Sequence, residues 1–349
     1  MNNTELDNLK RWLQTIFTDK LVIIVGSGLS CAEGLPSMRH LGKKLKQEMP
    51  SKISNENLKI WHEIAACLES DGLEGALLKH PANDAIESVI IKITAKYVLN
   101  EEQKAINRCI SENKKLKFSY LFPHISSCTP KMVRVITTNY DRLIEFAAEY
   151  EDWGVDSMMV GRYWGRYNPD LSKKLLVEKV VSSGKIPRLV YRNHIKIYKP
   201  HGSLDWFMAG GIPMTSCIGA MEHPLIITPG VGKYKKGYKQ PFDAHREQGN
   251  RAIDNASTIL CIGYGFNDDH LQTHLTTKIK SNIKTLILTK SLSDNARKVV
   301  GESSNCKALI SNGNPEGTIV VSDSKEVLIP GVKWWDIEYF VKEVLENGN

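Results

Sequence analysis

Glycine and small polar residues follow the first apolar run of the chain and could contact a phosphate group. Residues 21–28 read LVIIVGSG, so Gly26 and Gly28 come directly after five apolar residues. Glycine there lets the backbone approach a phosphate, and the N-terminus of the next helix supplies N–H donors. A dinucleotide dehydrogenase would need a third small residue where Cys31 stands and an acidic residue about twenty positions later. The pattern thus favours a phosphate-binding loop but disfavours a dehydrogenase.

Later apolar runs are short, rich in β-branched residues, and often end in Gly, Pro, Asn or His. These runs are residues 133–141 (VRVITTNYD), 195–203 (IKIYKPHGS), 225–230 (LIITPG), 258–266 (TILCIGYGF) and 285–290 (TLILTK). Helical patterns lie between them, for example over 141–150 and 267–280. The alternation predicts a doubly wound, Rossmann-like α/β fold with a parallel sheet. Such sheets bind ligands at the carboxyl ends of their strands, where the polar residues of these runs lie.

Other segments interrupt the alternation and define the predicted domains. The main α/β domain is predicted to comprise residues 1–39 and 133–300. Residues 40–132 carry apolar stripes at helical spacing and are predicted to form an inserted helical module. Residues 152–192 are predicted to form a basic, irregular insertion within the main domain, and residues 301–349 a C-terminal strand and helix.

The composition indicates a globular protein without a membrane span. Of 349 residues, 42% are hydrophobic and 24% charged, and the net charge is +7. The start of the chain lacks the apolar core of a signal peptide. The seven cysteines include no C-x-x-C pair, which fits a reducing cytoplasm. Residues 161–199 hold ten basic and two acidic residues, which could attract a nucleotide, nucleic acid or an acidic partner, or form a solvated surface.

Four motifs, in the right order, resemble those of sirtuins. GSGLSCAEGLPSMR (26–39) resembles the nucleotide loop of that family, although Met38 replaces the Phe that helps to cover nicotinamide. TTNYD (137–141) resembles the sirtuin Thr-Gln-Asn-Ile-Asp, and KPHGS (199–203) resembles its His-Gly. GYGFNDDH (263–270) resembles the Gly-Tyr-Ser-Phe-x-Asp-x-His of bacterial sirtuin-like proteins. The two C-x-x-C pairs that hold the structural zinc of protein-deacylating sirtuins are missing. The resemblance is therefore to zinc-free bacterial sirtuin-like proteins, many of which consume NAD in defence against phage.

This resemblance implies NAD as the substrate, no zinc, and specific roles for the matching residues. His201 would be the base, Asn139 would place a water or hold the ribose, and Asp141 would stabilise positive charge or orient Asn139. The residues implied to bind NAD are Gly26, Ser27, Gly28, Ser30, Arg39, Thr138, Gly263 and Asn267. The residues alone leave other roles open: a buried structural histidine at 201, helix capping at 139 and 141, and a surface cation at 39.

The resulting prediction is an NAD glycohydrolase that releases nicotinamide and ADP-ribose. The resemblance implies a cytoplasmic, NAD-depleting effector of anti-phage defence, gated by homo-oligomerisation or by a partner such as a helicase-like ATPase. Nucleic acid would be involved only indirectly, and a membrane not at all. Three alternatives stay open: a nucleotide-sensing module without turnover, an ADP-ribosyltransferase or deacylase, and a nucleic-acid-binding protein that uses residues 161–199.

Overall fold

The computed structural model describes most of the chain. The described residues are 2–128, 131–161, 163–182, 187–218, 223–229, 240–313, 316–323 and 325–346. The side chains of residues 126–128, 269 and 270 lie outside this description, as do Arg162 and residues 183–186 of the basic stretch. Within the described residues, no helix is both long and apolar enough to span a membrane.

The helices and strands of the described residues are given in chain order. The helices are α1 (Asn3–Gln14), α2 (Ser27–Ala32), α3 (Met38–Glu48), α4 (Asn55–Cys67), α5 (Gly72–Lys79), α6 (Asp84–Ser111), α7 (Leu121–Cys128), α8 (Leu143–Tyr150), α9 (Pro169–Lys174), α11 (Phe242–Asp254), α12 (Asp269–Lys280), α13 (Asp294–Gly301) and α14 (Ile337–Phe340), with the short helical segments η1 (Met49–Ser51), η2 (Lys117–Tyr120) and η3 (Val341–Glu346). The strands are β1 (Leu21–Val25), β2 (Met132–Thr137), β3 (Gly154–Asp156), β4 (Met159–Val160), β5 (Gly165–Tyr167), β6 (Val177–Val181), β7 (Arg188–Tyr191), β8 (His194–Tyr198), β9 (Gly202–Ala209), β10 (Ile212–Thr215), β11 (Pro224–Ile226), β12 (Thr258–Ile262), β13 (Lys284–Leu288), β14 (Cys306–Ser311), β15 (Gly317–Ser322) and β16 (Lys325–Pro330).

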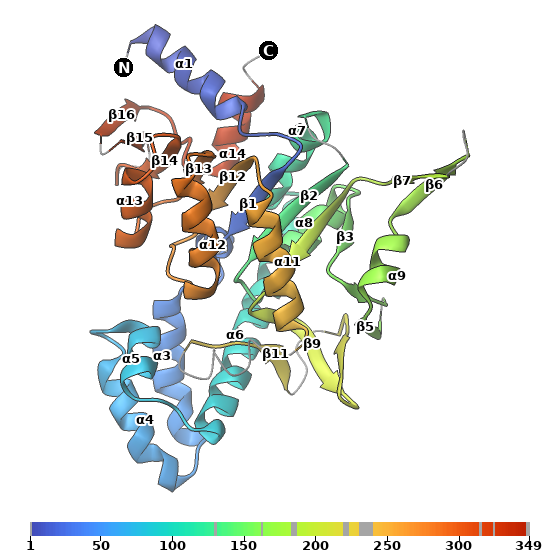
Figure 1. Cartoon of the computed structure of the whole chain (residues 1–349). Coiled ribbons are helices and arrows are strands. Elements are labelled where there is room, and N and C mark those ends of the chain that lie inside the picture. Colours follow the sequence, from blue (N-terminus) through green and yellow to red (C-terminus); the bar gives the residue numbers. More distant parts are fainter. Residues whose placement is uncertain are drawn as a thin grey trace.

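The main sheet confirms the predicted α/β fold. Its strand order is β16-β15-β14-β13-β12-β1-β2-β8-β3, and the strands from β14 to β3 pair in parallel. β15 and β16 extend one edge with antiparallel pairing. Helices cover both faces of the sheet, with α11, α12 and α13 on one face and α1, α7, α8 and α14 on the other (Figure 1).

The central strand β1 shows why an uninterrupted apolar run forms this sheet. Leu21, Ile23 and Val25 pack into the core beneath α1, α7 and α8. Val22 and Ile24 pack into the core beneath α11, α12 and α13. Side chains alternate between the two faces of a strand, so both sets must be apolar when helices cover both faces.

One predicted strand has a different partner from the one expected. The run at 225–230 resembled the parallel strands, but β11 pairs antiparallel with β9 in a second sheet of order β11-β9-β10-β5-β4. The expectation of a further parallel strand was therefore wrong, because an apolar run reports burial and not the direction of its partner. The strand predicted within residues 301–349 is confirmed as β15, and it joins the main sheet together with β14 and β16, which were not predicted.

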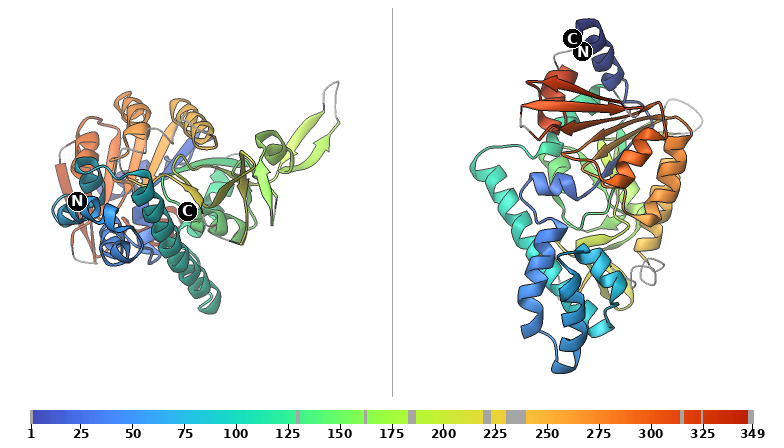
Figure 2. Two further views of the ribbon diagram at one scale, coloured as in Figure 1. Left: turned by 90° about the horizontal axis from the view of Figure 1, so that it is seen from below. Right: turned by 90° about the vertical axis from the view of Figure 1, so that its left-hand side faces the viewer.

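Helices α3, α4 and α5 gather at one end of the molecule, beyond the carboxyl ends of the parallel strands (Figures 1 and 2). They share a separate apolar core with the first half of α6, centred on Trp61, Ile64, Ile90 and Leu45. The second half of α6 and η2 pack instead into the core of the main sheet. Only the first part of the predicted module at 40–132 thus has a core of its own, and its division from the main domain stays a prediction.

The basic insertion contains a two-stranded hairpin of β6 and β7, which extends away from the body of the molecule (Figures 1 and 2). The first helix, α1, and the last helical segment, η3, lie at the end of the molecule opposite α4 (Figures 1 and 2). There α1 contacts η3, and Gln14 Nε2 donates to the carbonyl of Val344 at 2.8 Å.

Candidate active site

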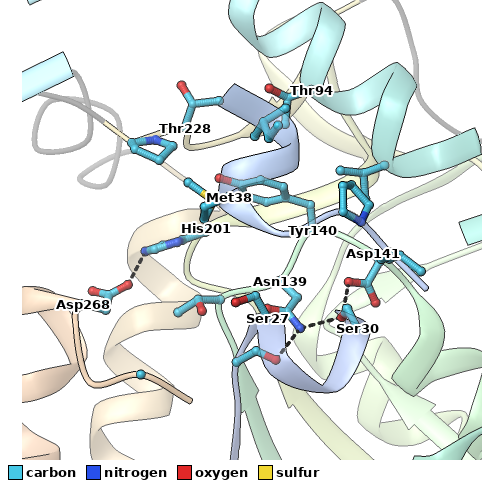
Figure 3. Close-up of a pocket in the computed structure, with 18 of the residues that line it drawn as sticks. Ser27, Ser30, Met38, Thr94, Asn139, Tyr140, Asp141, His201, Thr228 and Asp268 are labelled. Atoms are coloured by element: carbon cyan, nitrogen blue, oxygen red, sulfur yellow. Dashed lines mark hydrogen bonds and ion pairs between the residues drawn. The ribbon is translucent and has the colours of Figure 1, made fainter. Parts of the chain in front are cut away.

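A cleft of about 240 Å³ lies at the carboxyl ends of the parallel strands. Its floor comes from the segments that follow β1, β2, β8 and β12, and its roof comes from α3, α5, α6 and the segment after β11 (Figure 3). This is the edge at which the sequence predicted a ligand, because parallel strands present their following loops there.

The cleft brings together most of the residues singled out from the sequence. Those that line it are Gly26, Ser27, Ser30, Thr138, Asn139, Asp141, His201 and Asn267. Gly28 and Gly263 are not part of the lining and contact each other beside it. Arg39 is also outside the lining; its side chain is exposed on α3 and contributes to the electrostatic environment of Glu69. The roles of these residues in binding and catalysis remain predictions.

The glycines of the first loop are required by contact between two backbones. The N–H of Gly26 donates to Ile262 at 3.0 Å, and the N–H of Gly28 donates to Gly263 at 3.0 Å. A Cβ on Gly28 would lie 2.7 Å from the Cα of Gly263, and a Cβ on Gly26 would lie 2.5 Å from its carbonyl oxygen. Gly263 has φ +56, a conformation that favours glycine. The prediction that the backbone at Gly26 and Gly28 contacts a phosphate therefore needs a correction. Their two N–H groups already have acceptors within the protein and do not point to a ligand.

Asn139, Ser30 and Asp141 form a buried chain of hydrogen bonds in the floor (Figure 3). Asn139 Nδ2 donates to the carbonyl of Gly26 at 3.0 Å and to Ser30 Oγ at 2.8 Å. Ser30 Oγ in turn donates to Asp141 Oδ2 at 2.7 Å. The other oxygen of Asp141 accepts the N–H of Leu143, the first residue of α8, at 3.3 Å. Asp141 thus accepts the first N–H group of the helix, just before the N-cap residue Arg142, and anchors the floor at the same time.

A buried lysine supports this floor from behind. Lys199 is fully buried, and its Nζ donates to the carbonyl of Asp141 and to Glu145 Oε1, the latter at 2.9 Å. Burial raises the pKa of Glu145, although the contact with Lys199 acts in the opposite direction. Because Lys199 lies two residues before His201, it ties the segment after β2 to the segment that carries the histidine.

A second buried ion pair fixes the next residue of the same segment. Glu102 on α6 accepts the backbone N–H of Arg142 at 2.5 Å and its Nη2 at 2.6 Å. Burial raises the pKa of Glu102, and the hydrogen bonds and charge of Arg142 lower it in part. The helical region between β1 and β2 therefore holds the segment after β2 directly.

His201 lies opposite the Asn139 chain and pairs with a residue that the sequence analysis did not select (Figure 3). Its Nε2 lies 2.6 Å from Asp268 Oδ2, although the alignment of the two atoms falls short of that of a hydrogen bond. Asp268 belongs to the fourth motif, GYGFNDDH, and lines the same cleft. The motif could have drawn attention to Asp268 from the sequence alone. Its contact with His201 joins two loops that are distant in the sequence, so only the fold reveals that contact.

The roof is more apolar than the floor. Met38, at the start of α3, lines the cleft at 40% exposure, in the place where the resembled family has a phenylalanine. Thr94 and Glu74 from the helical region also line it, and the sequence analysis did not select them. Tyr140 joins the floor to the roof, since its hydroxyl donates to the carbonyl of Ile227 at 2.6 Å. Burial raises the pKa of this hydroxyl, so it stays protonated and able to donate.

Within the described parts of the chain, no group of three or more His, Cys, Asp or Glu side chains is arranged to hold a metal ion. The predicted absence of zinc stays a prediction. The polar groups of the cleft are instead amide, hydroxyl, imidazole and carboxylate groups, which suit hydrogen bonding to a sugar and movement of one proton.

Comparison with known proteins shows which family part of this chain resembles. The family model of the SIR2-like domain matches residues 133–305, just under half of the chain. Residues 133–305 are thus similar to the SIR2-like domain, and the resemblance shown by the motifs is supported at that level.

The solved structures that match this chain include those of Sir2 proteins. One Sir2 enzyme is 11% identical with a TM-score of 0.42, and one sirtuin is 14% identical with a TM-score of 0.45; each alignment covers 100% of both chains. A mutant Sir2 homologue in complex with ADP-ribose is 12% identical, with a TM-score of 0.43, over 84% of this chain and 87% of that one. No curated protein matches the sequence.

Proposed function

We propose that this chain is an NAD glycohydrolase that cleaves NAD into nicotinamide and ADP-ribose. The orientation of the Asn139 amide carries the proposal. Both N–H groups of that amide donate within the protein, so Oδ1 is the polar atom left for a ligand. An acceptor at this place suits a water molecule that is held by its hydrogen and attacks through its oxygen.

The proposed reaction breaks the bond between C1′ of the ribose and the nicotinamide nitrogen. The electron pair of that bond leaves with the nicotinamide, and the oxygen of water forms the new bond to C1′. The surplus proton of the water passes to His201 and then to solvent. His201 suits this step because a neutral imidazole has one ring nitrogen with a free lone pair that can accept a proton. The carboxylate of Asp141 would favour the positive charge that develops on the ribose.

The rest of NAD would extend along the floor. Ser27 would donate its hydroxyl to the diphosphate, with Thr138 beside it. Ser30, whose hydroxyl proton goes to Asp141, would line the same part of the site. Asn267 would lie near the adenosine, beyond the backbone contact of Gly263. Arg39 would need to move from its exposed position to reach the diphosphate, so it is the weakest member of the predicted binding set.

The proposal also includes regulation, because an unrestrained NAD hydrolase would poison its host. The resemblance to bacterial sirtuin-like proteins supports a cytoplasmic effector of anti-phage defence. It supports a homo-oligomer, or a partner such as a helicase-like ATPase, as the gate. The predicted module at 40–132 is a suitable route for control, because α6 holds Arg142 in the floor through Glu102.

The test is product analysis of NAD incubated with the purified protein, without any acylated peptide. We expect nicotinamide and ADP-ribose from the wild type, and at least about 100-fold less from His201→Ala and from Asn139→Ala. His274→Ala is the matched control, since His274 is exposed and pairs with Asp254 outside the cleft. Full activity in a folded His201→Ala variant would contradict the assignment of the base. Tight NAD binding without turnover, with native partners present, would favour the nucleotide-sensing module instead. If labelled NAD is used, transfer of its label to a protein would favour the ADP-ribosyltransferase.

A further inference from the structure

The side chains of His201 and Asp268 lie next to each other. His201 belongs to the loop that follows β8, and Asp268 belongs to the loop that follows β12. Their Nε2 and Oδ2 atoms are 2.6 Å apart, the separation of a charge-assisted contact. The His201 side chain is 14% exposed and that of Asp268 is 7% exposed, so bulk water screens the pair little.

The backbone at His201 is fixed independently of this contact. The carbonyl of His201 accepts the N–H of Ile227 at 2.9 Å. The next residue, Gly202, has φ +85, and a Cβ there would lie 1.9 Å from the carbonyl oxygen of Leu225. With the backbone held, the direction of the imidazole depends on what its ring atoms meet, and the carboxylate of Asp268 is what Nε2 meets.

The second ring nitrogen of His201 is in a different situation. Nδ1 makes no hydrogen bond to any residue that the structure describes. Nε2 is a buried polar atom without a hydrogen-bond partner, but Nδ1 is not one of those buried atoms. A carboxylate at Nε2 favours the tautomer that carries its proton there. Nδ1 then keeps its lone pair and is the atom able to accept a proton from the cleft.

We propose that Asp268 is a positioning residue for His201, which selects the Nε2–H tautomer and leaves Nδ1 as the base. This inference rests on the proposed NAD hydrolysis. When Nδ1 takes the proton of the attacking water, the ring becomes an imidazolium, and the adjacent carboxylate stabilises its charge. Asp268 itself stays ionised and exchanges no proton. The motif GYGFNDDH (263–270) would thereby take part in the reaction as well as in binding.

The kinetic test compares Asp268→Asn with the wild type. The amide of an asparagine can donate to Nε2 and would favour the opposite tautomer, with the proton on Nδ1. We expect kcat to fall by roughly 100- to 10,000-fold, as for loss of a general base or of its orienting carboxylate in other enzymes. The KM for NAD should change by less than about 3-fold, because the variant removes a transition-state interaction.

The matched control is Asp254→Asn, which removes the carboxylate from the other His–Asp pair, between His274 and Asp254 at 2.9 Å. That pair is exposed and lies outside the cleft, so this variant should hydrolyse NAD like the wild type. A fall in kcat of the same size in both variants would overturn the proposal, as would an unchanged kcat in Asp268→Asn.

A spectroscopic readout separates this proposal from the proposed function. Nitrogen chemical shifts of the ring of His201 in ¹⁵N-labelled protein distinguish the two tautomers without any substrate. The wild type should give the Nε2–H pattern, and Asp268→Asn should shift toward Nδ1–H. Identical ring shifts in the two proteins would overturn the positioning role even if NAD is hydrolysed. A shift in a protein that hydrolyses no NAD would uphold the pairing and reject the enzymatic function.

Discussion

His245 makes the stability of this protein sensitive to mild acid. It lies on α11 and is fully buried, with its ring centroid 4.6 Å from that of Trp206. Its Nδ1 accepts the backbone N–H of Lys199 at 3.2 Å, while its Nε2 has no hydrogen-bond partner among the described residues. Burial, and then the charges of Lys199 and Lys196, lower its pKa to about 3.

The sign and size of the effect follow from that pKa. The unfolded chain binds a proton at this histidine below about pH 6.5, whereas the folded protein does not until about pH 3. The stabilising contribution is therefore complete above pH 6.5 and is lost as the pH falls through this window. Within the window the free energy of unfolding should fall by about 1.4 kcal/mol per pH unit on account of His245 alone.

The assay is urea unfolding, followed by tryptophan fluorescence at several pH values between roughly 7 and 5, for the wild type and His245→Asn. Asparagine can still accept the Lys199 N–H but does not titrate, and all other groups contribute equally to both proteins. We expect the wild type to lose about 1 kcal/mol more than the variant for each pH unit below about 6. A difference in stability that stays constant over this range would refute the reasoning.

Three further predictions concern the supports of the cleft. Lys199→Met should lower the free energy of unfolding by about 3 kcal/mol, because it leaves the carboxylate of Glu145 without its cation. Urea unfolding of the double variant with Glu145→Met should recover most of this loss, and equal losses in single and double variants would contradict the pairing. Gly263→Ala should lower the free energy of unfolding by about 2 kcal/mol or more, since the φ of Gly263 is +56 and the new Cβ would meet the backbone of α2. A variant that melts at the same temperature as the wild type would contradict this prediction. Tyr140→Phe should cost about 1–2 kcal/mol in the same melting experiment by leaving a carbonyl of the roof unpaired, and no change would show that another donor replaces the hydroxyl.

The sequence was sufficient for the central strands and insufficient for the second sheet. β1 and β12 are buried on both faces, which favours apolar residues throughout; β1 is wholly apolar and β12 departs only at Thr258. Such runs are visible without a structure. β16 was not predicted, because four of its first five residues are exposed and its pattern is that of a polar edge. The strand at 225–230 was expected, but its antiparallel partner β9 was not, since pairing depends on the path of the whole chain.

The same division applies to the cleft. Asn139, Asp141 and His201 follow strands that the sequence predicted, so their arrival at one edge of the sheet could be expected. The contact of His201 with Asp268 could not, because it joins loops that only the strand order brings together. The glycine after β1 was read as space for a phosphate, whereas the structure fills that space with the backbone of Gly263.

The pairing of β1 with β12 has a consequence for the newly made chain. Leu21 pairs with Thr258, so one edge of the central strand finds its partner only after most of the protein has been synthesised. At about 5–20 residues per second, the ribosome needs roughly 10–50 s to reach that partner. Throughout this interval LVIIV is an apolar strand with an open edge, the kind of segment that aggregates or recruits a chaperone. The pairing that completes the centre of the sheet in the finished protein is thus also one that leaves the growing chain open to misfolding.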